Sequence, residues 1–102
     1  MDFESLATNG VLQLVRNLAI EFGPRNVRIN AIAPGVIRTD FARALWEAPG
    51  AEAAFRKAVP LGRIGEAAEI AGAAVFLASP AATYMTGQSI VIDGGMTIRG
   101  SI

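Results

Sequence analysis

Apolar residues recur at helical spacing in two separate stretches of the chain. Gly23-Pro24 follows the first stripe and Ser79-Pro80 follows the second, and each pair is expected to end a helix because proline cannot continue one. The first stripe comprises Val11, Leu14, Val15, Leu18, Ala19 and Phe22, and the second comprises Ile70, Ala73, Ala74, Leu77 and Ala78. We therefore predict two amphipathic helices, the first capped by Ser5 or Thr8.

Two short apolar runs lack this spacing and are rich in branched residues. Residues 27–32 precede Ala33-Pro34-Gly35, and residues 90–92 precede Asp93-Gly94-Gly95. Both patterns predict strands that end in turns, and the second strand, a continuous apolar run, is expected to be covered on both faces of its sheet. The order helix, strand, helices, strand is typical of an α/β domain, in which a right-handed crossover joins two adjacent parallel strands.

The stretch between the two strands has a weaker pattern. Pro49-Gly50 separates two short helical faces, and residues 60–65 read as a loop. The faces are formed by Phe41, Ala44, Leu45 and Trp46, and by Ala53, Ala54 and Phe55. We find no repeat, low-complexity tract or linker, so we expect residues 1–102 to form a single unit.

Composition excludes several classes of protein. Nine basic residues balance nine acidic ones with no basic run, which argues against nucleic-acid or anionic-membrane partners. The absence of Cys and His excludes thiolate or imidazole metal sites, Cys nucleophiles and Ser-His-Asp triads. No apolar run approaches the roughly 20 residues that cross a bilayer, and the first eight residues do not resemble a signal peptide. We expect a cytoplasmic protein without a metal.

Three blocks of the sequence, in matching order and spacing, resemble the classical short-chain dehydrogenases/reductases. Residues 26–40 (NVRINAIAPGVIRTD) are similar to the sixth strand and nicotinamide loop of that family. Residues 60–65 with Glu69-Ile70 resemble the segment after its substrate loop, and residues 84–95 resemble its last strand and turn. The resemblance runs from about Gly10 to the end of the chain, whereas residues 1–9 diverge.

This resemblance implies the C-terminal part of a Rossmann-like, doubly wound parallel sheet. The family's glycine-rich phosphate loop, G-x-G-x-x-G, has no counterpart in the sequence. The family uses NAD or NADP on alcohol and ketone groups. The choice between the two cofactors is set outside the matching blocks. Because the blocks include the nicotinamide loop but no pyrophosphate or adenine site, we expect weak dinucleotide binding or none.

The resemblance also implies four cofactor-binding residues. Pro34-Gly35 would turn the chain beneath the nicotinamide ring, the main chain of Ile37 would hold the carboxamide, and Thr39 would add a hydroxyl contact. Main-chain groups suit this task because they are the least mobile donors, and hydride transfer needs a fixed ring. The alternative is that Pro34-Gly35 is only a turn and Thr39 only a helix cap.

The region from Phe41 to Val59 would correspond to the family's variable substrate loop. Phe41, Leu45 and Trp46 are then candidates for the lining of an apolar pocket or lid. They are equally well explained as core packing, because such a stripe at helical spacing more often packs than recognises a ligand. The substrate is not identified by these residues.

The family's catalytic Tyr, and the Lys four residues after it, have no match. The chain has one Tyr and one Lys, Tyr84 and Lys57, in the wrong order. The expected pair of positions holds Glu4 and Thr8 or, with a slip of one residue, Ser5 and Asn9. The family's catalytic Ser and Asn would lie before this segment. We therefore predict no catalytic residue in the chain.

Three interpretations follow. The chain is a shortened oxidoreductase (a gene fragment, an alternative start or a deliberately shortened product), a non-catalytic module that binds itself or a protein partner, or a weak nucleotide binder.

The strand at 27–32 would lack the neighbour that it has in the family, so its edge would be open to pairing. We therefore expect a homo-oligomer, or a complex with a partner that supplies the missing strands.

Overall fold

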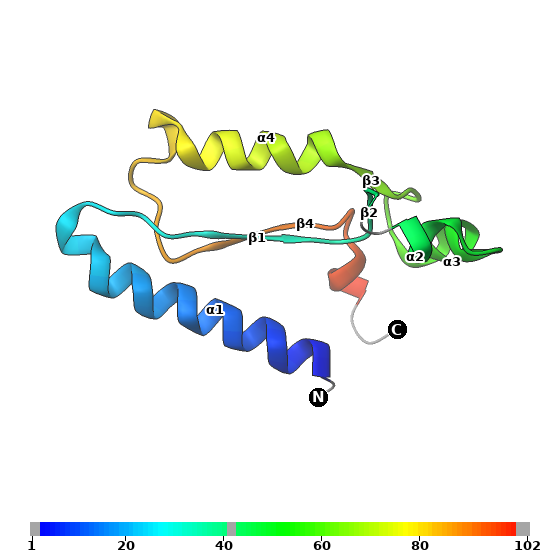
Figure 1. Cartoon of the computed structure of the whole chain (residues 1–102), viewed down its shortest axis with the longest axis horizontal. Helices are drawn as coiled ribbons and strands as arrows, with labels where there is room; N and C mark the ends of the chain where they lie inside the picture. The colour runs from blue at the N-terminus through cyan, green and yellow to red at the C-terminus, as the bar shows by residue number, and fades with distance from the viewer. Residues whose placement is uncertain (1–2, 41–42, 100–102) are drawn as a thin grey trace. The chain divides into compact units, whose positions relative to one another are not determined.

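A computed structural model of the chain describes residues 3–40 and 43–99 as a mixed α/β arrangement (Figure 1). The predicted helices and strands occur in the predicted order, together with two short strands that were not predicted. They are α1 (Phe3–Phe22), η1 (Gly23–Arg25), β1 (Ala31–Pro34), β2 (Ile37–Arg38), α2 (Arg43–Glu47), α3 (Ala51–Ala58), β3 (Gly65–Glu66), α4 (Ala67–Ala78), η2 (Pro80–Ala82), β4 (Ser89–Ile92) and η3 (Met96–Arg99).

Helix α1 ends where the sequence predicts and begins earlier. It stops at Phe22, and Gly23 with Pro24 starts the short 3₁₀ turn η1. Asn26 has a left-handed φ of 60° and its amide donates to the carbonyl of Gly23 at 2.8 Å, which completes the stop. Because the helix begins at Phe3, Ser5 and Thr8 lie inside it. The predicted cap was wrong, since helix continues through both positions.

The apolar stripe of α1 is only partly covered. Val15 and Ala19 are buried, whereas Val11 and Leu14 are each 56% exposed. In α4, Ile70, Ala73 and Leu77 are half-buried, while Ala74 and Ala78 are exposed. The helices form as predicted, but in the described chain only part of each stripe has something to pack against.

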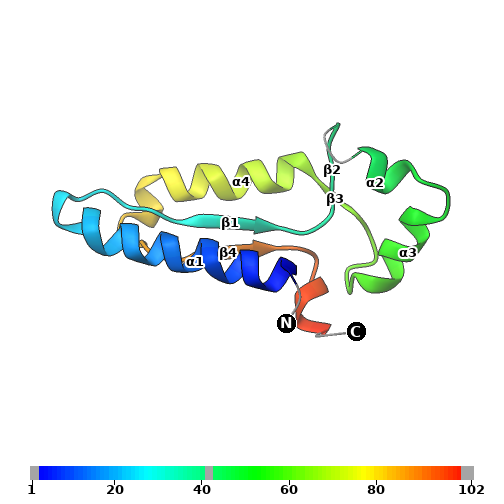
Figure 2. The same cartoon turned by 60° about the horizontal axis from the view of Figure 1, so that its bottom comes forward.

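Strands β1 and β4 run side by side and in parallel (Figures 1 and 2). The amide of Ala31 donates to the carbonyl of Gln88, and the amide of Gly35 donates to that of Ile92, both at 2.9 Å. Residue numbers rise together along the two strands, as parallel pairing requires. The predicted pair of adjacent parallel strands is confirmed.

The first of these strands starts four residues later than predicted. Ile29, inside the predicted strand, bonds to the loop before β4 instead of to a strand. Its amide donates to the Thr86 hydroxyl at 3.0 Å, and its carbonyl accepts from the amide of Gly87 at 2.8 Å. Residues 27–30 are therefore extended without belonging to a sheet.

Two polar side chains fix this extended segment to the same loop. Asn30 donates to the carbonyl of Met85 at 3.0 Å and accepts from the amide of Gln88, also at 3.0 Å. The Arg28 guanidinium donates to the carbonyl of Leu77 at 2.8 Å and to that of Met85 at 3.3 Å. A cation at Leu77, in the last turn of α4, also suits the negative end of the helix dipole.

A second parallel pair, β2 with β3, was not predicted. Ile37 lies opposite Gly65, and Arg38 lies opposite Glu66. Each strand has only two residues, which is too short for a period-two pattern to show in the sequence. The 60–65 segment that reads as a loop therefore ends in a strand.

The last strand is less covered than its apolar sequence suggests. Ile90 and Ile92 are half-buried, but Val91 between them is 54% exposed. Alternating side chains point to opposite faces of a sheet, so within the described part of the chain the Val91 face of β4 is the less covered one. The expectation of cover on both faces is not met among the described residues.

Contacts within the chain divide it into two compact units. One spans Met1–Ile32 and Ala74–Ile90, and the other spans Ala33–Ala73 and Val91–Ile102. The first contains α1 and the loop that Arg28 and Asn30 hold. The second contains β2, β3, α2 and α3.

None of the helices in the described chain has the length and apolar character needed to cross a membrane.

Replacing Asn30 with Ala should destabilise the chain by about 1–3 kcal/mol, because one main-chain carbonyl and one amide each lose a partner. Urea unfolding followed by far-ultraviolet circular dichroism measures the change. Asn17 is the matched control, since it accepts only from Gln13 on the exposed side of α1, and N17A should change stability by less than about 0.5 kcal/mol. Equal losses in N30A and N17A would contradict this role of Asn30.

Candidate functional site

The four residues predicted to bind the cofactor line one open cleft. Pro34, Gly35, Ile37 and Thr39 border a hollow of about 620 Å³, together with Ala67, Ile70 and Ala71 from the first turns of α4. All of these residues belong to the second compact unit. The structure thus brings the four predicted residues together and adds a wall of apolar side chains that the sequence analysis did not assign to the site.

Gly35 has a structural requirement of its own at the edge of this cleft. Its amide donates to the Ile92 carbonyl, and a Cβ atom at this position would lie 2.7 Å from Cβ and 2.8 Å from Cα of Asp93. Such distances are too short for a side chain. Glycine is therefore needed to bring the Pro34-Gly35 segment against the turn after β4, whether or not a ligand is present.

That turn is organised by the carboxylate of Asp93. Its two oxygens accept from the amides of Gly95 and Thr97, both at 2.9 Å, and hydrogen bonding to Thr97 holds the pKa of Asp93 below its usual range. Gly94 and Gly95 have φ values of 65° and 93°, which glycine adopts without strain. The cleft thus rests on a turn that is fixed by main-chain bonds.

The predicted substrate residues differ in exposure and in their contacts. Phe41 lies outside the described residues. Leu45 is 61% exposed, whereas Trp46 is half-buried and its indole N–H donates to the carbonyl of Thr39 at 3.2 Å. Trp46 therefore lies beside the cleft through its bond to Thr39, and Leu45 points to solvent in the described chain.

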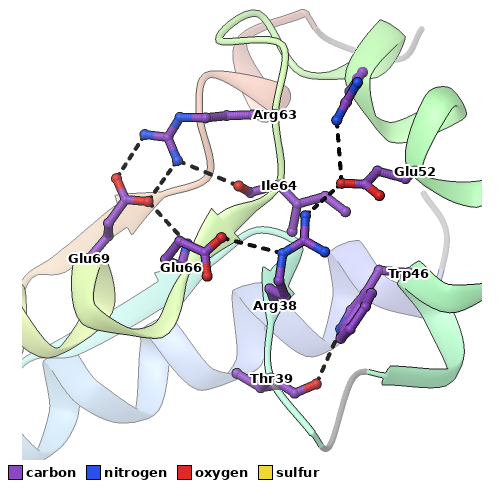
Figure 3. A network of polar contacts seen from close by, with 9 residues as sticks. Arg38, Thr39, Trp46, Glu52, Arg63, Ile64, Glu66 and Glu69 are labelled. Atoms are coloured by element: carbon purple, nitrogen blue, oxygen red, sulfur yellow. Dashed lines mark hydrogen bonds and ion pairs between the residues drawn. The ribbon is translucent and has the colours of Figure 1, made fainter.

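Arg38 is the centre of a polar network that the sequence analysis missed (Figure 3). Its guanidinium pairs with Glu52 at 2.5 Å and with Glu66 at 3.3 Å, and its Cζ lies 4.8 Å from the centre of the Trp46 ring. These partners come from α3, β3 and α2. No local signal in the sequence marked Arg38, because β2 has only two residues and the partners of Arg38 lie 8 to 28 residues further along the chain.

A second ion pair lies next to this network. Arg63 donates to both carboxylate oxygens of Glu69, at 2.7 and 2.8 Å, and the amide of Glu66 donates to the same carboxylate at 3.0 Å. The hydrogen bond from Arg63, followed by that from the Glu66 amide, lowers the pKa of Glu69 from 4.5 to about 2. The first turn of α4, which borders the cleft, is anchored in this way to the 60–65 segment.

Comparison with known proteins identifies the family of the chain. A family model described as enoyl-(acyl carrier protein) reductase matches residues 4–97. A tropinone reductase homolog from Arabidopsis thaliana is 46% identical over 95 residues, which cover 93% of this chain and 36% of that protein. Galactitol 2-dehydrogenase (L-tagatose-forming) from Cereibacter sphaeroides is 46% identical over 94 residues, which cover 91% of this chain and 37% of that protein.

Solved structures agree with the sequence matches. A 4-hydroxyisoleucine dehydrogenase complexed with NADH superposes with a TM-score of 0.83 at 32% identity, over 88% of this chain and 37% of the other. A protein provisionally named 2-deoxy-D-gluconate 3-dehydrogenase, from Agrobacterium tumefaciens with bound NADP, superposes with a TM-score of 0.84 at 41% identity, over 92% and 38% of the two chains.

Fold, motifs and matches place the chain in the Rossmann-like α/β class. The chain belongs to the short-chain dehydrogenase/reductase family, as its three motif blocks predict. It spans about a third of the length of the curated relatives that it matches.

The ion pair of Arg63 with Glu69 should make stability depend on pH. A carboxyl whose folded pKa lies below its unfolded pKa contributes stability above the unfolded value, and loses it as the pH falls through the folded value. The urea midpoint of the natural chain should therefore exceed that of E69Q by a constant amount above pH 4.5, and the difference should shrink as the pH falls from 4.5 towards 2. A difference that stays constant over this range would mean that the ion pair does not form in solution.

Proposed function

We propose that this chain carries the nicotinamide end of the cofactor site of an NAD(P)-dependent oxidoreductase that acts on alcohol or ketone groups. The observation that supports it is the cleft of about 620 Å³ lined by Pro34, Gly35, Ile37 and Thr39. These residues were selected from the sequence motif alone, and they border a single hollow in the folded chain.

The chemistry of the lining suits a nicotinamide ring. Ile37, Ile70 and the two alanines of α4 offer apolar contact to a flat ring, and Thr39 offers a hydroxyl for the carboxamide. In this proposal the main chain of Ile37 binds the carboxamide, and Pro34 with Gly35 supports the ring. When bound, a nicotinamide cofactor donates or accepts the hydride. Two of the similar structures contain NADH or NADP, which is the reason for proposing a nicotinamide cofactor here.

The substrate would meet the ring beside the segment that holds α2. Trp46 is bonded to Thr39, so its indole is placed next to a proposed cofactor residue. Phe41 and Leu45 belong to the same proposed substrate segment. Leu45 is exposed in the described chain, which suits a side chain that becomes covered only when a substrate or a further part of the protein lies on it.

We also propose that the 102-residue chain has no turnover by itself. A proton must move to or from the substrate oxygen, and the family uses a Tyr with a Lys four residues later for this step. Tyr84 and Lys57, the one Tyr and the one Lys in the sequence, do not form that pattern. The role of the chain in this proposal is cofactor and substrate positioning.

A second candidate function is association through exposed apolar residues. Such side chains occur on α1, α4 and β4: Val11, Leu14, Ile20, Val75, Phe76 and Val91. Exposed apolar groups of this kind favour contact with another protein surface. In the described chain β1 pairs with β4 alone, which leaves its other edge open for a strand from a partner.

We expect no NAD(P)H turnover by the isolated chain with a panel of ketones and alcohols, because loss of the acid-base group alone costs about 10²- to 10⁴-fold in rate. Turnover that persists after removal of host enzymes would refute this expectation.

Dinucleotide binding by the isolated chain should be too weak to detect by titration calorimetry at micromolar concentration, since the sequence has no glycine-rich phosphate loop. A micromolar affinity for NAD or NADP would contradict this prediction.

The isolated chain should form a homo-oligomer, or aggregate when no partner supplies a strand to the open edge of β1. Light scattering during size-exclusion chromatography at micromolar concentration measures the mass. Replacing the exposed Ile20 of α1 and Val91 of β4 by polar residues, one at a time, shows which surface carries the contact. A stable, cooperatively unfolding monomer would contradict the proposal.

A further inference from the structure

Helix α2 has little apolar anchorage. None of its described residues, 43–47, is buried, and Trp46 is the one half-buried side chain among them. Arg43 is paired locally, with Asp40 at 2.7 Å and with Glu47 at 3.5 Å. The position of α2 against β2 therefore depends strongly on how the Trp46 side chain is held.

Two groups from the segment 38–39 hold the Trp46 side chain. The indole N–H donates to the carbonyl of Thr39, and the guanidinium of Arg38 lies over the ring at 4.8 Å (Figure 3). A cation over the face of an indole is attracted by the negative charge of its π electrons. The ring is thus bound at its edge by a main-chain acceptor and at its face by a cation.

Arg38 is itself prevented from turning away. Glu52 accepts from Nη2 and Glu66 accepts from Nε, so carboxylates from α3 and β3 fix the plane of the guanidinium. Each ion pair is partly exposed and weak alone. Together they orient the cation, because Nε and Nη2 are held by two separate groups.

The same strand borders the proposed cofactor cleft. Ile37 and Thr39 line the cleft, whereas Arg38 between them does not, because the amide of Thr39 donates to the carbonyl of Ile37 at 2.9 Å and turns the chain at Arg38. The main chain of residues 37–39 is therefore shared by two structures. One side contributes to the cleft, and the other side holds Trp46.

We infer that Arg38 is a positioning residue that fixes Trp46, and α2 with it, beside the cofactor cleft and so sets one wall of the substrate site. The inference rests on the proposed function for the identity of the site, whereas the position of Trp46 is a property of the free chain.

The experiment uses Trp46 as its own reporter, since it is the single tryptophan of the chain. Fluorescence emission and quenching by acrylamide are measured for the full chain and for R38Q without any nucleotide. Loss of one exposed cation–π contact should shift the equilibrium between held and free indole by about two- to five-fold. R38Q should therefore show faster quenching and emission at longer wavelength, and R38K, which keeps a charge without the flat guanidinium, should lie between the two.

R63Q is the matched control. It removes a two-point ion pair with Glu69 in the same compact unit without touching Trp46, so its quenching should equal that of the natural chain. Circular dichroism establishes that each variant is folded. If R38Q does not fold, E52Q replaces it, because it keeps the cation and loosens its orientation, and faster quenching is again expected.

Natural quenching in folded R38Q, or in E52Q where that variant is used, would overturn the inference. Equally increased quenching in R63Q would also overturn it, since the effect would then be general loosening. No nucleotide is present, so these outcomes leave the proposed cofactor cleft untouched. Failure of the proposed function would appear instead in the nucleotide-binding and turnover measurements.

Discussion

The parallel pairing of β1 with β4 is the constraint on which the rest of the chain depends. Parallel strands cannot be joined by a tight turn, so everything between them is a long connection. That connection contains β2, α2, α3, β3 and α4, followed by the short turn η2. At one end of the pairing Asn30 fixes the loop before β4, and at the other end Gly35 lies directly against Asp93. The first contact needs a side chain that both donates and accepts, as Asn30 does, and the second needs a residue without a Cβ atom, as Gly35 is.

Polar contacts, more than apolar burial, organise the unit that holds the cleft. Only Val59 and Ile64 are buried among its described residues, whereas every ion pair found in the described chain lies within it. Exposed ion pairs add little stability individually. Their effect here is orientation: Arg38 fixes the indole of Trp46, and Arg63 fixes the first turn of α4.

In the proposed function, cofactor and substrate positioning meet on three consecutive residues. Ile37 and Thr39 face the cleft, while Arg38 faces the network that holds α2. An oxidoreductase must place a hydride donor and its acceptor within contact of each other. In the proposed function, the turn at Arg38 directs the side chains of residues 37–39 to both partners and links their positions through one short main-chain segment. This link is the structural basis for assigning both roles to one short segment.

The sequence alone determined the family, the helices and the four residues of the proposed cofactor cleft, because these depend on local motifs and on helical spacing. It did not determine that β1 starts at Ala31, that β2 pairs with β3, or that Arg38 contacts Glu52, Glu66 and Trp46. Strand boundaries and ion pairs join residues far apart in the chain. Their partners are chosen by hydrogen-bond geometry and proximity in the folded state, which no local pattern of apolar and polar residues encodes.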